Sequence, residues 1–216
     1  MPFSQESPIN IHDAIYCELG DRGLQLHLDG PVFGTVKKDE HGVKVEIQHV
    51  PSHFVILDRK KFHLIGFHFH HPAEHWIEGN LNSMELHVVH QNIDDGTIAV
   101  VGIMLDVAKK NSAANAPEKV VKFIAGVAKV LKAAAATAGK VSTSPKVFLP
   151  PNPKEYYRYE GSLTTTPYSE TVSWVVMRNP LLMKKDELIE LIVEFKKEAR
   201  FLQPVNRRFV LKTFKK

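Results

Sequence analysis

Hydrophobic and polar residues alternate in short runs through the first half of the chain. The runs are rich in β-branched and aromatic residues, and glycine, proline or an Asp-Asp-Gly turn separates them. They predict strands at residues 24–28, 32–37, 43–49, 54–57, 62–70, 84–90 and 97–105. The connections are too short for the crossover helices of parallel βαβ units. We therefore expect a largely antiparallel or mixed sheet and not a doubly wound one.

The second half of the chain contains two segments with helical spacing. Apolar residues recur at that spacing over residues 117–137, and Gly139 is a plausible stop signal for this helix. A second helix is predicted over residues 185–199, with apolar positions Leu188, Ile189, Ile192, Val193 and Phe195. A proline-rich connection and a strand at residues 171–177 lie between them. The pattern predicts a mostly β fold with peripheral helices, of the α+β class, in a single domain over residues 1–216.

Composition narrows the class of protein. The chain has 216 residues, of which 44% are hydrophobic and 24% charged, so collagen-like, coiled-coil and disordered classes are excluded. A domain of this size can fold without disulfides or a structural metal, so a bound metal would be functional. Cys17 is the only cysteine, which excludes an intramolecular disulfide. The net charge of +4 is small and no recognition motif accompanies the basic C-terminus, so we expect no nucleic-acid partner.

The sequence carries no membrane signal. Its first residues lack the basic and apolar regions of a signal peptide, and no apolar run approaches the ~18 residues of a membrane span. We expect no membrane association and, for the sequence as given, a cytoplasmic location; a removed signal peptide would make the protein periplasmic or secreted. The oligomeric state stays open, with a homodimer as one option.

The placement of the histidines suggests a metal site. In a strand, side chains alternate between faces, so His68 and His70 point the same way. His87, in the next long strand, would complete a set of three if the two strands are neighbours. Three histidines with an open fourth position make a catalytic zinc site, whereas structural zinc sites use four protein ligands. A His-x-His pair on a strand also occurs without metal, so spacing alone leaves both interpretations open.

Further motifs extend this pattern along the chain. In chain order they are FHFH at 67–70, AEH at 73–75, ELHVVH at 85–90 and GSLTTTP at 161–167, with SPINI at 7–11 before them and RFLQPVNRR at 200–208 after them. This series resembles the motifs of the α-class carbonic anhydrases over nearly the whole chain. The resemblance implies a twisted, largely antiparallel central sheet with a conical active-site cleft.

The resemblance also implies a reaction. It is that of a zinc-dependent carbonate dehydratase, which hydrates carbon dioxide reversibly to bicarbonate and a proton by attack of zinc hydroxide. The implied zinc ligands are His68, His70 and His87, and the implied inhibitors are sulfonamides and anions. A catalytically weak or inactive binding protein on the same fold is the alternative, because residues around the ligands depart from the family pattern. The three retained histidines argue against that alternative.

Other site residues follow from the same resemblance. Thr164 would accept a hydrogen bond from the zinc hydroxide and donate one to Glu74, and Glu85 would orient His87. Thr165 would line the bicarbonate side. The carbon dioxide pocket would be apolar and lined by Val89, Val100, Leu163, Val172 and Trp174.

The chain departs from the family at the proton shuttle. Aligning residues 40–43 with the family places Val43 where efficient members have a shuttle histidine. His41, two residues earlier, could relay protons instead, and a rival alignment places His53 at the shuttle position. Gly66 stands where the family often has a glutamine that orients the first zinc ligand, so that ligand needs another partner.

Overall fold

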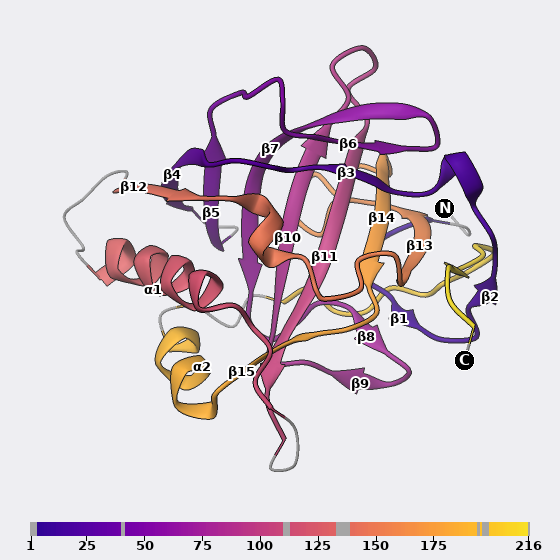
Figure 1. Cartoon of the computed structure of the whole chain (residues 1–216). Coiled ribbons are helices and arrows are strands. Elements are labelled where there is room, and N and C mark those ends of the chain that lie inside the picture. The colour runs from indigo at the N-terminus through magenta and orange to yellow at the C-terminus, as the bar shows by residue number, and fades with distance from the viewer. Residues whose placement is uncertain are drawn as a thin grey trace.

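One large mixed sheet forms the centre of the molecule (Figure 1). The structure, a computed structural model, describes residues 4–39, 42–109, 113–132, 139–193, 195 and 199–215. Its long strands are β4 (Val32–Asp39), β5 (Gly42–Ile47), β6 (Phe54–Leu57), β7 (Lys60–His70), β10 (Met84–Gln91), β11 (Ile98–Val107), β12 (Gly139–Thr143), β13 (Tyr156–Gly161) and β14 (Val172–Met177).

Shorter elements complete the chain. The short strands are β1 (Asn10–Ile11), β2 (Ile15–Tyr16), β3 (Gln25–His27), β8 (Trp76–Ile77), β9 (Asn80–Leu81), β15 (Leu181–Met183) and β16 (Leu211–Lys212). The helices are α1 (Glu118–Lys132) and α2 (Lys185–Ile192), with the 3-10 turns η1 (Gly20–Arg22) and η2 (Pro145–Phe148). Among the described residues, no helix has the length and apolar character of a membrane span.

The main sheet has the strand order β12-β4-β5-β7-β10-β11-β14-β13-β16-β2. Every pair from β12 to β11 is antiparallel, whereas β11 pairs with β14 in parallel. The mostly β class and the largely antiparallel sheet predicted from the sequence are therefore confirmed, as are all seven strands predicted before residue 110. The sequence analysis missed β12 and β13.

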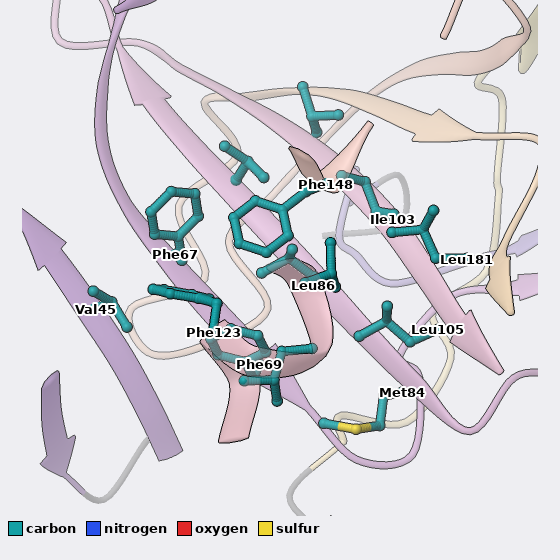
Figure 2. Close-up of a cluster of buried hydrophobic side chains, with 14 of the residues drawn as sticks. Val45, Phe67, Phe69, Met84, Leu86, Ile103, Leu105, Phe123, Phe148 and Leu181 are labelled. Carbon is teal, nitrogen blue, oxygen red and sulfur yellow. The ribbon is translucent and has the colours of Figure 1, made fainter. Parts of the chain in front are cut away.

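One face of the sheet packs against the helices. Phe67 and Phe69 of β7 contact Phe123 of α1, with ring centroids 5.9 and 6.3 Å apart. Phe148 of η2 lies 5.3 Å from both Phe67 and Phe123, and Figure 2 shows these rings together over β7 and β10. This face is the main hydrophobic core, and the apolar stripe of α1 completes it.

The opposite face carries a second apolar cluster and the histidines. Because side chains alternate along a strand, β10 directs Leu86 and Val88 to the helix side and His87 and Val89 to the other. The same alternation in β7 puts Phe67 and Phe69 on the helix side. Two adjacent central strands therefore supply core and site residues at once.

A β-bulge interrupts the alternation in β7. Gly66 pairs with Val89 and Leu64 with His90, so Ile65 is an extra residue on this strand. Gly66 packs directly against the backbone of β5. A Cβ at this position would lie only 2.7 Å from the carbonyl oxygen of Val45. The glutamine that many relatives have at this position therefore does not fit this backbone.

The second predicted helix is shorter than expected. The spacing predicted a helix over residues 185–199, but α2 ends at Ile192, and the Phe195 N–H donates to the Ile192 carbonyl. Residues 194 and 196–198 of the predicted helix lie outside the described residues. Ile189 and Val193 were predicted to be core positions and are instead 44% and 68% exposed. Leu188 and Phe195 lie in the core as predicted, together with Leu191, which was not among the predicted positions. The first predicted helix is α1, and its expected end at residues 133–137 lies outside the described residues.

A buried histidine makes the fold acid-sensitive. Burial lowers the pKa of His90 to about 4 from its ordinary 6.5. Between these values the unfolded chain takes up a proton that the folded chain excludes, so the free energy of unfolding falls by about 3 kcal/mol as the pH drops through this window. Urea denaturation at pH 7 and pH 4.5 measures this loss, which should be smaller in His90→Gln. An unchanged loss in that variant would contradict the assignment.

Candidate metal centre

The three histidines singled out in the sequence lie on one face of β7 and β10. His68 is directly opposite His87 in the antiparallel register. The rings of His70 and His87 have their centroids 4.4 Å apart. The two strands are thus neighbours, as the predicted ligand set requires.

Two groups of metal-binding side chains meet at His87. The first is His70, Glu74 and His87, and the second is His75, Glu85 and His87; within each group the candidate ligand atoms lie within 4.8 Å of one another. All of these residues are buried. Neither of these groups of described residues includes His68, which is half-buried. The two groups therefore include His70 and His87, two of the three predicted ligands, and the full ligand set stays a prediction.

Buried polar atoms without partners point to a ligand at this position. Within the described part of the chain, His70 Nε2 and Glu74 Oε2 are buried and have no hydrogen-bond partner. Such groups are normally paired, so an unpaired set suggests that something else binds there. Burial, reinforced by repulsion from His87, holds the pKa of His70 well below its usual range. His70 is therefore a neutral imidazole, the form that binds a metal ion.

Glu85 joins the parts of the site. Its Oε2 accepts the backbone N–H groups of Glu74 at 2.9 Å and His75 at 2.8 Å. Its Oε1 lies 2.8 Å from His75 Nδ1 and 2.9 Å from His87 Nε2, the latter without hydrogen-bond alignment. Burial alone would raise the pKa of Glu85, but attraction to His75 and His87 and the hydrogen bond with His75 hold it well below its usual range. Glu85 is therefore an ionised carboxylate.

The contact with Glu85 selects one nitrogen of His87. Burial opposes charge on this ring, but attraction to Glu85 outweighs burial and raises the pKa of His87. With Nε2 beside the carboxylate, Nδ1 is the nitrogen left for a metal ion. Glu85 thus contacts His87, and its orienting role stays a prediction.

A glycine makes room for the carboxylate. Gly102 of β11 pairs with His87, and a Cβ at Gly102 would lie 2.8 Å from Glu85 Oε1. Any side chain at this position would displace the carboxylate from its partners.

Residues that the sequence analysis did not single out extend this network. His75 Nε2 lies 2.6 Å from the hydroxyl of Tyr159 in β13, and that hydroxyl donates to Ser7 Oγ at 2.8 Å. The Ser162 N–H also donates to Ser7 Oγ, at 3.1 Å. His75, Ser7 and Ser162 stand inside the recognised motifs, whereas Tyr159 lies outside them.

Thr164 and Glu74 are neighbours, and their role in orienting a water stays a prediction. Burial raises the pKa of Glu74, while attraction to His87 and the nearby hydroxyl of the buried Thr164 oppose the rise. Glu74 Oε1 accepts the backbone N–H of Arg200 at 3.1 Å and lies 3.5 Å from His70 Nδ1. The Arg200 guanidinium donates to the Ser7 carbonyl at 2.7 Å, which ties the closing motif to the opening one.

The predicted apolar pocket residues form one cluster beside His87. Val89, Val100 and Trp174 are opposite one another on β10, β11 and β14. The Trp174 ring lies 4.8 Å from that of His87. Val172 belongs to the same buried cluster, Leu163 packs against it and Thr165 is half-buried.

The structure changes the interpretation of the shuttle position. Val43 was placed there by alignment, but its side chain is buried in the helix-side core opposite Phe69, so it does not face the histidines. His53, the rival, is buried with its Nε2 3.2 Å from the Gly30 carbonyl oxygen. His41 lies outside the described residues.

A cavity of about 740 Å³ lies away from the histidines. Its lining includes Arg158, Glu160, Arg208 and Phe209, from β13 and the C-terminal segment. The conical cleft at the histidines stays a prediction.

Comparisons with known proteins point to one family. The model of the eukaryotic-type carbonic anhydrase family matches residues 3–214. A carbonic anhydrase of Nostoc sp. is 32% identical over 171 residues, covering 79% of this chain and 61% of that protein. One from Klebsiella pneumoniae is 32% identical over 208 residues, covering 95% of this chain and 79% of that protein.

Solved structures show the same similarity. The α-carbonic anhydrase of Thermovibrio ammonificans, in complex with sulfanilamide, superposes with a TM-score of 0.77 at 31% identity, covering 96% of this chain and 87% of that one. The enzyme of Photobacterium profundum superposes with a TM-score of 0.74 at 31% identity, covering 96% and 88%.

Removing the Tyr159 hydroxyl tests the extended network. Tyr159→Phe leaves His75 Nε2 and Ser7 Oγ without this partner in a buried position, so the free energy of unfolding should fall by about 1–3 kcal/mol. Tyr157→Phe is the matched control on the same strand, because its hydroxyl makes no hydrogen bond to the described residues and its ring packs on Phe214. Chemical denaturation compares the two variants. Equal losses would show that the hydroxyl of Tyr159 contributes nothing specific.

Proposed function

Because the chain belongs to the eukaryotic-type (alpha) carbonic anhydrase family, we propose that it is a zinc enzyme that hydrates carbon dioxide reversibly to bicarbonate and a proton. The observation that carries the proposal is the close approach of the buried His70 and His87. Glu85 lies beside one nitrogen of His87, and His68 lies opposite His87 on the neighbouring strand. A zinc ion bound by three neutral imidazoles lowers the pKa of its water from 15.7 to about 7, which supplies a nucleophile at neutral pH; carbonic anhydrase is the standard example.

The residues present fit a zinc ion. His70 would bind through Nε2, which is buried without a partner, and His87 through Nδ1, since Nε2 faces Glu85. His68 lies on the same strand face and would supply the third nitrogen. Glu74 is less suited as a ligand, because Oε1 already accepts the Arg200 N–H. Neutral nitrogen ligands leave the full charge of the metal to act on the water.

Thr164 and Glu74 would orient the reacting water. A Thr164 hydroxyl that donates to Glu74 can only accept from the water, so the oxygen lone pair of that water is directed away from Thr164. Such a pair discriminates against ligands that have no proton to donate. The Arg200 N–H donates to Glu74 Oε1 and holds the carboxylate in place.

Carbon dioxide is apolar, and the site offers it apolar surface. Val89, Val100 and Trp174 line one side of His87 and exclude water from that side. Thr165 would contact the bicarbonate product. The Thermovibrio enzyme has been solved with sulfanilamide, and we expect sulfonamides and simple anions to inhibit this protein as well.

Two substitutions separate the proposed ligand set from the alternative His70, Glu74 and His87. His68→Ala should lose stoichiometric zinc after dialysis, because a nitrogen ligand is removed. Glu74→Gln should keep one zinc per chain and lose hydration activity, because only the hydrogen bonding to Thr164 changes. Zinc content is measured by atomic absorption and activity by stopped-flow hydration.

The reverse pattern, with full zinc in His68→Ala and none in Glu74→Gln, would overturn the ligand set. A fully zinc-loaded wild type with no hydration activity at alkaline pH would favour a binding protein on this fold.

Thr164→Ala tests the orienting step. The rate of hydration should fall on the order of 10²-fold, by analogy with the loss of one oxyanion-hole donor, while zinc content stays at one per chain. Anions without a proton should inhibit the variant more strongly than the wild type. Thr164→Ser keeps the hydroxyl and should recover most of the rate. An unchanged rate and unchanged anion inhibition in Thr164→Ala would show that Thr164 has no part in the reaction.

A further inference from the structure

A second pair of histidines lies outside the metal centre. His63 is near the start of β7, five residues before His68, so the two are about 17 Å apart along the strand. His49 follows β5 and is exposed. The extra residue at the bulge puts His63, which pairs with Gln91, on the same sheet face as His68.

The spacing of this pair suits one metal ion. The ring centroids of His49 and His63 are 5.1 Å apart, with the planes tilted by 54°. Two imidazoles that bind one ion with metal–nitrogen bonds of about 2.0–2.1 Å have ring centres about 4.5 Å apart at the square-planar angle of Cu²⁺ and about 5 Å apart at the tetrahedral angle. The separation of the two ring centres therefore matches that of two imidazoles on a shared ion.

His63 provides an independent sign of a missing ligand. Its side chain is 7% exposed, and within the described part of the chain its Nδ1 has no hydrogen-bond partner. Buried ring nitrogens are normally paired. Burial, the charge of Lys61 and His49 all lower the pKa of His63, against a weaker opposing attraction from Asp94. The ring is therefore neutral at pH 7, as a metal ligand must be.

We propose that His49 and His63 form a second metal site, for a divalent transition metal, with Cu²⁺ bound most tightly. Nitrogen ligands favour Cu²⁺ over the other first-row divalent ions. The exposed His49 leaves the remaining coordination positions to water. His27 stacks on Phe54, 4.3 Å away, and Phe54 lies between it and His63 in the strand register, so His27 is a neighbour rather than a ligand.

Copper titration of the zinc-treated full chain tests this site. Cu²⁺ is added at one equivalent, excess is removed by gel filtration, and retained copper is counted by atomic absorption. The electron paramagnetic resonance spectrum should show coupling to two imidazole nitrogens. His49→Gln and His63→Gln should each lose one equivalent of retained copper relative to the wild type. The matched control His27→Gln should retain it.

His49 is exposed, so replacing it should not disturb the fold, and the copper result for His49→Gln can be interpreted directly. His63 is buried, so circular dichroism establishes that His63→Gln is folded, and His49→Gln carries the result if it is not. Retention of the same copper and the same nitrogen coupling in His49→Gln would overturn the proposal. The proposal would also be overturned if the wild type retained no more copper than His49→Gln, because the two rings would then make only an aromatic contact. If His49→Gln loses the bound copper and His68→Ala retains it, the result supports this site whatever the outcome for the zinc centre.

Discussion

The site depends on one buried carboxylate. An ionised Glu85 in the interior would be very costly without partners, and two backbone N–H groups and two imidazoles surround it. These contacts fix the loop at residues 74–75 against β10 and leave one defined nitrogen of His87 for a metal. Gly102 on the next strand leaves the space that the carboxylate occupies. Removing Glu85 would therefore disturb the loop, the ligand and the network to Tyr159 together.

The central sheet serves two purposes through the alternation of its side chains. The helix side of β7 and β10 builds the aromatic and aliphatic core around Phe123, and the other side carries His87 beside Trp174. Because each strand contributes to both sides, packing of the core holds the site residues in place. A site on strands at the centre of the sheet is more rigid than one on loops. The Thr164 loop is the exception, and it is held through Glu74 and the Arg200 N–H.

The sequence predicted what depends on local pattern. Period-two alternation correctly placed His68 and His70 on one face, and the same pattern located the strands of the first half of the chain. The alternation could not predict the bulge at Ile65. The bulge reverses the direction of the side chains before it in β7, so His63 lies on the same face as the metal centre. The Tyr159 contact joins segments far apart in the chain and leaves no local signal. Alignment placed Val43 at the shuttle position, but the pleat of β5 turns it into the core.

Diffraction from zinc-loaded crystals at the zinc absorption edge tests the central claim most directly. The anomalous peak should be bonded to three imidazole nitrogens, those of His68, His70 and His87, with His87 bound through Nδ1 and its Nε2 still facing Glu85. In that arrangement Glu85 orients a ligand and does not bind the ion. A peak bonded to a carboxylate oxygen of Glu74 or Glu85 in place of a histidine nitrogen would contradict this description of the site.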